Sequence, residues 1–169
     1  MRFRAIAAVA ALCLLAVGCG GKNEAKPTPT THEKYVPVVP EKISEGTGAC
    51  ALLTQGEVAA AVGLPANPGD GIQSEGGGSC HWSLRGSGAQ SVNLVTLTPG
   101  GSPYEQTLST APKPIEPLSG VGDHAFIATD TVWAFKGPRV IAVQVNLGQP
   151  LSVRKQYATT LAQAAIARA

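Results

Sequence analysis

Residues 125–147 read AFIATDTVWAFKGPRVIAVQVNL and hold the strongest fold signal in the chain. Three apolar runs, at 125–128, 132–136 and 140–147, are separated by a Thr-Asp pair and a Gly-Pro pair. Turn-forming pairs between apolar runs of this length are typical of β-hairpins. The stretch therefore predicts two consecutive hairpins, which form an antiparallel meander.

Two further strands are expected upstream of this meander. Cys80, Trp82 and Leu84 alternate with polar residues, which is the pattern of a half-buried strand. Residues 92–98 are apolar on both sides, which indicates a central or covered strand. The sequence thus predicts a sheet of about five strands.

A first helix is predicted where Thr54 and Glu57 form a capping box, in which each side chain accepts the other residue's backbone N–H. Leu53 and Val58 occupy the positions of a hydrophobic staple around this helix start. Gly63 stands where a left-handed C-cap ends a helix. These signals define both ends of a short helix.

Two more helices complete the pattern. One begins at Ser102, with Pro103 in its first turn, and turns Tyr104 and Leu108 inward. The last is capped by Ser152. Its apolar side consists of Val153, Tyr157, Leu161, Ala164 and Ala165. The expected fold is α+β in the order α-β-β-α-β-β-β-α, an antiparallel sheet with the N-terminal and C-terminal helices packed on one face.

The N-terminus has the features of an export signal. Arg2 and Arg4 precede an apolar run of about a dozen residues, which is too short to span a bilayer but suits a signal peptide. The run ends in Leu-Ala-Val-Gly before Cys19 and resembles the lipobox of bacterial lipoproteins, although its leucine lies one position early. We therefore predict a signal peptide at residues 1–18 and lipidation of Cys19. Ordinary signal cleavage without a lipid is the alternative.

Residues 19–48 are expected to be a disordered tether rich in Pro and Thr, because they are polar and show no hydrophobic period. Residues 49–169 then form a single domain, held by the lipid at the extracytoplasmic face of the cell membrane. Arg2 and Arg4 account for the whole net charge of +2, so the chain behind the signal peptide is neutral. This balance excludes a nucleic-acid partner, which needs a basic surface.

The cysteines divide by position. Cys13 lies in the predicted signal peptide and Cys19 takes the lipid, so Cys50 and Cys80 remain. In an oxidising compartment two remaining cysteines predict one disulfide, which would close a loop of about 30 residues. Two buried free thiols are the alternative. A metal site is less favoured, because the sequence has no Cys-x-x-Cys spacing and no nearby histidine pair.

Three short motifs suggest a family. They are CALLTQGEVAAAVG at residues 50–63, CHW at 80–82 and GVGDHA at 120–125. In this order, behind a lipobox, they resemble the actinobacterial lipoproteins of domain of unknown function 3558, and the resemblance runs from Cys50 to the C-terminus. It implies a cell-envelope location and a Cys50–Cys80 bridge, and it implies no activity. The first motif is also similar to the extracellular sensor domains of some actinobacterial Ser/Thr kinases, which favours binding over catalysis.

Candidate catalytic residues are few. The GVGDHA motif has the spacing of a dinucleotide fingerprint but no preceding strand and following helix, so we expect a tight turn in which Asp123 accepts backbone N–H groups. His124 beside Asp123 forms half of an acid–base pair, or else is a solvated turn residue. His32 lies in the tether, and His81 should point outward from its strand. The sequence has no Gly-x-Ser-x-Gly elbow.

The aromatic residues are expected either in the core or in a binding cleft. Trp82 should pack on the disulfide, whereas Trp133 and Phe135 share a strand face and either line a ligand cleft or meet a helix. Our leading prediction is a non-enzymatic envelope lipoprotein, without cofactor or metal, that binds an envelope protein or a small apolar ligand. The alternatives are a lipid or glycolipid carrier with an apolar cavity and, third, a hydrolase around His124 and Asp123.

Overall fold

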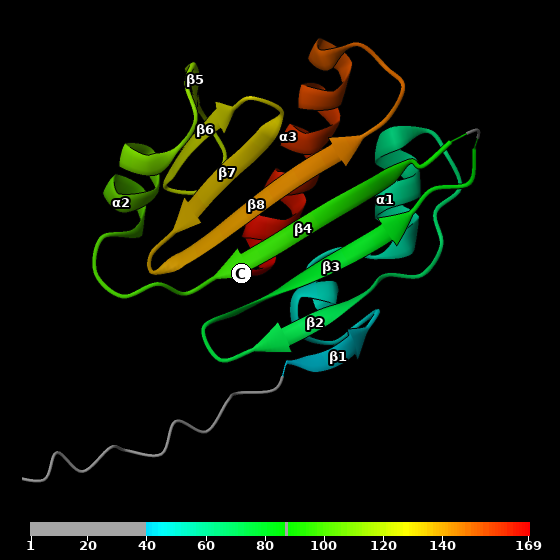
Figure 1. The fold of residues 1–169 in the computed structure, drawn as a ribbon, viewed down its shortest axis with the longest axis horizontal. Coiled ribbons are helices and arrows are strands. Elements are labelled where there is room, and N and C mark those ends of the chain that lie inside the picture. The colour runs from blue at the N-terminus through cyan, green and yellow to red at the C-terminus, as the bar shows by residue number, and fades with distance from the viewer. Residues whose placement is uncertain (1–39, 87) are drawn as a thin grey trace, which may run out of the picture. The chain divides into compact units, whose positions relative to one another are not determined.

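The computed structural model describes residues 40–86 and 88–169, which form an α+β domain with one antiparallel sheet of eight strands in the order β1-β2-β3-β4-β8-β7-β6-β5 (Figure 1). The strands are β1 (Glu41–Ser44), β2 (Asp70–Ser74), β3 (Gly77–Ser83), β4 (Ser91–Leu97), β5 (Ile115–Leu118), β6 (His124–Ala128), β7 (Thr131–Lys136) and β8 (Arg139–Asn146). The helices are the 3₁₀ helix η1 (Gly48–Ala51), α1 (Gln55–Val62), α2 (Pro103–Thr110) and α3 (Leu151–Arg168). The α+β class is thus confirmed, while the predicted strand number of about five is too low.

The three strands missing from the prediction are β1, β2 and β5. Strand β1 lies within the predicted tether, β2 within a loop rich in Gly and Pro, and β5 within a Pro-rich stretch. Each is short and carries few buried side chains; in β1 only Ile43 is buried. Backbone pairing with a neighbouring strand holds them, and such pairing leaves no hydrophobic period in the sequence. The folded domain therefore begins before residue 49, since β1 is part of the sheet.

The main core lies between one face of the sheet, here called the inner face, and the helices α1 and α3. Figure 1 shows both helices behind the sheet. Alternate residues of the central strands point into this core and are fully buried, among them Leu94, Val132 and Val143. Helix α3 packs directly on β7 and β8. The prediction that the N-terminal and C-terminal helices share one face is confirmed.

Helix α2 packs on the opposite face, here called the outer face. It covers a second cluster of Ala111, Phe126, Ala128, Phe135 and Val140. Tyr104 meets Phe135 edge to face at a centroid distance of 5.2 Å, and Leu108 packs beside it. Both α2 side chains point inward, as the sequence predicted. The sheet is therefore covered on both faces over its second half, from β6 to β8.

Helix α1 has the predicted ends. Glu57 N donates to Thr54 Oγ1 at 3.3 Å, and Thr54 N donates to Glu57 Oε2 at 2.9 Å, which completes the capping box. Gly63 ends the helix with a φ of 70°. These interactions are local in sequence, which is why a short motif was sufficient to predict them.

Helix α3 begins differently from the prediction. Its N-cap is Pro150 and no side chain caps it, so the expected cap at Ser152 is wrong. Its buried face is Ala158, Leu161, Ala162, Ala165 and Ile166. Of the predicted face only Leu161 and Ala165 are fully buried. Small alanines let the helix approach the sheet closely, and this contact, rather than the apolar period, sets its rotation.

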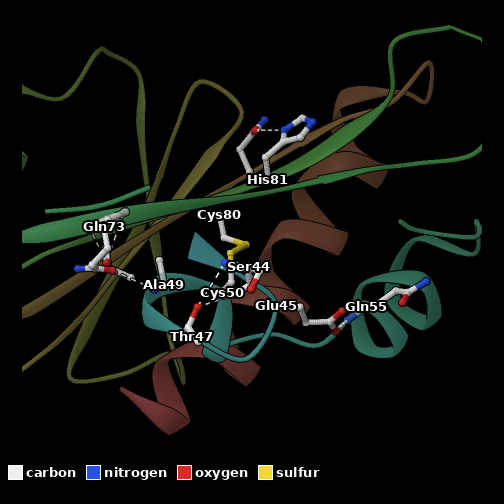
Figure 2. The surroundings of a disulfide bond; sticks show 12 residues. Ser44, Glu45, Thr47, Ala49, Cys50, Gln55, Gln73, Cys80 and His81 are labelled. Atoms are coloured by element: carbon white, nitrogen blue, oxygen red, sulfur yellow. Dashed lines mark hydrogen bonds between the residues drawn. A yellow bond between two sulfur atoms is a disulfide. The ribbon is translucent and has the colours of Figure 1, made fainter. Parts of the chain in front are cut away.

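A disulfide joins Cys50 of η1 to Cys80 of β3, with a Cα–Cα distance of 5.1 Å, and both residues are fully buried (Figure 2). A Cβ atom at Gly69 would lie 2.6 Å from Trp82 Nε1 and 2.8 Å from Cys80 Sγ, so the indole and the bridge adjoin. The predicted bridge and the predicted place of Trp82 are both present. The disulfide fixes η1 to the inner face of the sheet.

Candidate binding surface

The outer face is covered over one half only. Within residues 40–86 and 88–169, helix α2 lies over β6 to β8, while outward side chains of β2, β3 and β4 remain accessible. We call this accessible part the open face and define it by six residues. They are Ile72, Ser79, His81, Asn93, Val95 and Leu97. The pairing register places them side by side, because directly opposed residues of neighbouring strands point to the same face.

The open face gathers the exposed apolar side chains. Among the described residues, four large hydrophobic side chains are exposed, and three of them are Ile72 at 50%, Val95 at 37% and Leu97 at 39%. The fourth, Leu151 at 43%, stands at the start of α3. Single exposed apolar residues are ordinary on protein surfaces, whereas a cluster marks an interaction site.

These three side chains line a hollow of about 290 Å³. Its floor consists of Gly77, Gly78 and Ser79 of β3. A Cβ atom at Gly77 would lie 2.2 Å from the backbone oxygen of Thr96, so a larger residue does not fit there without moving the strands. The close approach of β3 and β4 therefore requires glycine at position 77, which leaves that part of the hollow without a side chain.

A row of polar side chains lies beside the hollow. His81 Nδ1 and Asn93 Oδ1 are 2.7 Å apart, and Asn93 Nδ2 donates to Ser91 Oγ at 3.4 Å. With the amide oriented in this way its oxygen only accepts, so Nδ1 of the imidazole carries the proton. His81 points away from Cys80, on the other side of β3 (Figure 2), which confirms its predicted outward direction. The row thus offers hydrogen-bond donors and acceptors beside the hollow.

The charges of the open face stand at its border. Strands β3 and β4 contain no Asp, Glu, Lys or Arg. The pairing register places Lys42 beside Ile72 and Asp70 beside His81 on the same face, and Glu75 lines the hollow. The centre of such a surface suits apolar side chains and hydrogen-bonding groups of a partner, while the charges at its border can steer the approach of that partner.

Trp133 and Phe135, predicted to line a ligand cleft or to meet a helix, both pack in the second cluster on the outer face and both stack on Phe126. Phe135 is 2% exposed and lies under α2, so it belongs to the second core cluster. Trp133 is half-buried and stacks on Phe126 at a centroid distance of 6.3 Å. Trp133 pairs with Ala142 on β8, and Ala142 pairs with Val95 on β4, so the three residues lie in one row across the sheet. Trp133 therefore marks the border between the covered half and the open face.

Asp123 and His124 lie together at a hollow of about 360 Å³ beside α2, but each is engaged elsewhere. Asp123 Oδ2 accepts the backbone N–H of Gly137 at 2.8 Å. The imidazole of His124 stacks on Tyr104 at 4.5 Å, and no hydrogen bond joins it to Asp123 in the described part of the chain. Gly120 and Gly122 have φ angles of 77° and 63°, as expected for the predicted tight turn. The motif has a structural role here, with no acid–base pair formed.

None of the six residues that define the open face was named as a binding residue from the sequence, Ile72 and Leu97 included. Ile72 is the single large apolar residue of β2, which was not expected to be a strand. The apolar character of both sides of β4 was the available signal for Leu97. It predicted a central or covered strand; β4 is central in the sheet, and the structure buries Val92 and Leu94 on its inner face and leaves Val95 and Leu97 exposed.

The described residues contain no group of three or more metal-ligating side chains and no helix long and apolar enough to cross a membrane. The predicted signal peptide and Cys19 lie outside the described residues. No protein-family model, curated protein or solved structure matches the chain.

Proposed function

We propose that the protein is a cell-envelope lipoprotein whose domain binds a partner through the open face and catalyses no reaction. The observation that carries this proposal is the gathering of Ile72, Val95 and Leu97 around one hollow. Burying these side chains against a partner removes apolar surface from water, which favours binding by about 25 cal/mol for each Å² buried. The adjacent polar row supplies directional hydrogen bonds, which give specificity.

Among the possible partners, a protein of the cell envelope fits this surface best. The open face is broad and shallow rather than an enclosed cavity, and protein interfaces combine an apolar centre with polar groups around it in this way. The two side chains predicted to line a carrier cavity, Trp133 and Phe135, pack against other aromatic rings instead. This packing favours the binding proposal over the lipid carrier.

The anchor belongs to the same proposal. Residues 1–18 direct export and Cys19 is lipidated, which holds the domain at the extracytoplasmic face of the membrane. We expect that Cys19→Ala moves the protein from the membrane fraction to the soluble fraction and abolishes incorporation of labelled palmitate. A membrane-bound Cys19→Ala protein would contradict the anchor.

Membership of the actinobacterial lipoproteins of domain of unknown function 3558 is part of the proposal too. What supports it is that the first two motifs carry the cysteines of one disulfide, Cys50 and Cys80. The third motif forms a turn with Gly120 and Gly122 at positive φ. The motifs thus occupy positions where the fold requires those residue types.

The binding proposal is tested with two matched variants. Val95→Lys combined with Leu97→Lys places charge on the open face, and Leu151→Lys makes the same change at the exposed start of α3. We expect the domain to capture an envelope protein, the first variant to lose it, and the second to retain it. Thermal unfolding verifies that both variants are folded. Equal capture by all three proteins would contradict the proposal.

A further inference from the structure

We propose that the protein also binds a neutral oligosaccharide on the outer face of the sheet. The ligand would lie against Trp133 of β7 and along a row of polar side chains that crosses the middle of the sheet. The inference goes beyond the proposed function, which assigns the protein partner to Ile72, Val95 and Leu97 at the hollow. It follows from the pairing register, from hydrogen-bonding groups that the fold leaves unused, and from the position of the charges.

Four polar side chains lie in one row across four neighbouring strands, and we call this row the polar belt. They are His81 of β3, Asn93 of β4, Gln144 of β8 and Thr131 of β7, each paired with the next. Directly opposed residues point to the same face, which is the outer face, because His81 points outward. The belt crosses three strand spacings, or about 14 Å, and so suits a short chain of sugar rings better than a single ring.

Trp133 stands beside the belt. It follows Thr131 by two residues on the same strand, so both side chains point to the same face. The indole is half-buried and is held by its stacking on Phe126. Toward the open face its neighbour in the row is the small Ala142, and Val95 follows. A fixed aromatic ring offers the C–H groups of a sugar an apolar surface, while polar groups beside it reach the hydroxyls.

The amides of the belt keep hydrogen-bonding groups that the fold does not use. Gln144 Nε2 donates to Asp130 Oδ1 at 3.0 Å, and within the described residues Gln144 Oε1 accepts no hydrogen bond. Asn93 Nδ2 donates to Ser91 Oγ at 3.4 Å, and Asn93 Oδ1 lies 2.7 Å from His81 Nδ1. An amide nitrogen carries two hydrogens and an amide oxygen two lone pairs, so each amide retains a donor and an acceptor. Sugar hydroxyls both donate and accept, and two neighbouring hydroxyls fit one such amide.

Asp130, in the turn between β6 and β7, orders one end of the belt. Its Oδ1 accepts Gln144 Nε2 at 3.0 Å and Thr131 Oγ1 at 3.4 Å. Its Oδ2 accepts Arg154 Nη1 at 3.2 Å, and the side chains of this ion pair are 21% and 22% exposed. Side chains that are already ordered lose little freedom when a ligand binds, which favours binding.

The charges around the belt favour a neutral sugar over an acidic one. Strands β3 and β4 contain no charged residue, and Arg154 is already paired with Asp130. At the other end of the belt, Asp70 pairs with His81 in the register. A carboxylated sugar would be repelled by Asp70, whereas the hydroxyls of a neutral sugar can donate to its carboxylate.

Tryptophan fluorescence tests the site, because the chain has two tryptophans and Trp82 is fully buried beside the disulfide. A change caused by a ligand at the surface therefore reports on Trp133. The full-length protein is titrated with cellotetraose, maltotetraose and mannotetraose, and with tetragalacturonate as the acidic counterpart. We expect a saturable change with at least one neutral sugar and none with tetragalacturonate. No saturable change with any neutral sugar, or an equal change with the acidic one, would overturn the proposal.

A matched pair of variants locates the site on the belt. Gln144→Ala removes an amide from the belt, and Gln163→Ala makes the same change on the exposed side of α3. The dissociation constant of the sugar should rise about tenfold in the first variant and stay unchanged in the second. Thermal unfolding verifies that both variants are folded. Equal dissociation constants in the two variants would overturn the assignment to the belt.

A further measurement needs no substitution. The side-chain amide NMR signals of Asn93 and Gln144 in the full-length protein should shift as the sugar is added. The corresponding signal of Gln163 should stay in place. Shifts of equal size at all three side chains, or at Gln163 alone, would contradict a site on the belt.

The saccharide site and the proposed function fail in different ways. If Gln144→Ala weakens sugar binding but lysines on the open face leave protein capture unchanged, the saccharide site stands and the proposed function is wrong. If the lysines abolish capture but no neutral sugar changes the fluorescence, the open face binds a protein and the saccharide site is wrong.

Discussion

The two halves of the outer face differ in what covers them. In the covered half, Phe126 and Phe135 are 1% and 2% exposed beneath α2. In the open half, Val95 and Leu97 are 37% and 39% exposed, although both stand on a central strand of the same sheet. Residue type does not explain the difference, since both halves present large apolar side chains. The position of a single helix does.

The comparison separates folding from binding. The half of the sheet formed by β1 to β4 is stabilised from the inner face, where the disulfide, Trp82 and α1 meet. It therefore does not need a helix on its outer face. Helix α2 follows β4 in sequence but lies over the strands that follow it. The apolar groups left on the open face are thus available for a partner.

The largest effect is expected in the covered half. Phe126→Ala removes a buried ring that contacts Tyr104, Trp133 and Phe135. The free energy of unfolding should fall by about 3–5 kcal/mol, as for other buried Phe→Ala changes. Denaturant unfolding measures it. A loss no larger than that of Val95→Ala would show that α2 covers the cluster only loosely.

Loss of the disulfide should come next. Replacing both Cys50 and Cys80 by Ser opens the bridge between η1 and β3. We expect a loss of about 2–5 kcal/mol, because the unfolded chain regains the freedom that the closed loop denies it. Reduction of the unsubstituted protein should lower its melting temperature in the same way. An unchanged melting temperature on reduction would contradict the stabilising role of the bridge.

A smaller loss is expected at the start of α1. Thr54→Ala removes the oxygen that accepts Glu57 N, and a lost N-cap costs about 1 kcal/mol. Chemical denaturation of this variant should be compared with Thr98→Ala, which alters an exposed threonine after β4. Equal stability of the two variants would mean that the capping box contributes nothing.

The pH dependence of stability tests the ion pair between Glu57 of α1 and Arg168 of α3. Hydrogen bonds from Arg168, and then from the Thr54 backbone N–H, lower the pKa of Glu57 from 4.5 to about 2. A lowered folded-state pKa means that the contribution is complete above about pH 4.5 and is lost as the pH falls toward 2. Both groups are partly exposed, so solvent weakens the effect.

Glu57→Gln keeps a residue that suits the capping box and removes this ionisation. Its stability should change less between pH 4.5 and 2 than that of the unsubstituted protein. Glu105→Gln, in the exposed first turn of α2, is the control. Parallel stability curves for Glu57→Gln and the unsubstituted protein would rule out the Arg168 contact as the cause.

The smallest effect on stability is expected on the open face. Val95→Ser and Leu97→Ser should each change the free energy of unfolding by no more than about 0.5 kcal/mol, since they alter exposed side chains. Leu108→Ser, on the α2 side that packs on the covered half, should cost more. Similar losses at Leu97 and Leu108 would erase the distinction between the two halves.

The structural features that depend on residues close together in the sequence were predicted correctly. The capping box at Thr54, the turn at Gly120 and the meander from β6 to β8 all arise from local signals. The disulfide followed from the cysteines left after the predicted signal peptide and lipid site were set aside. The strand β2 was missed because its pairing with β3 compensates for a sequence with little hydrophobic pattern.

The binding surface was harder to predict, because it depends on the three-dimensional path of α2. The sequence indicated that Tyr104 and Leu108 face inward but not which strands they cover. It placed Trp133 and Phe135 on one strand face, as the structure does, but did not show how far α2 covers that face: Phe135 is buried and Trp133 is half-buried. Which half of a sheet remains open is a property of the fold and has no local signal.

The most direct test of the open face as a binding surface is photo-cross-linking in living cells. The photo-reactive residue is placed at position 95 in one strain and at position 151 in another, both exposed apolar sites. We predict that position 95 forms a covalent complex with a second envelope protein and that position 151 does not. A complex formed from position 151 alone, or equally from both positions, would contradict this account.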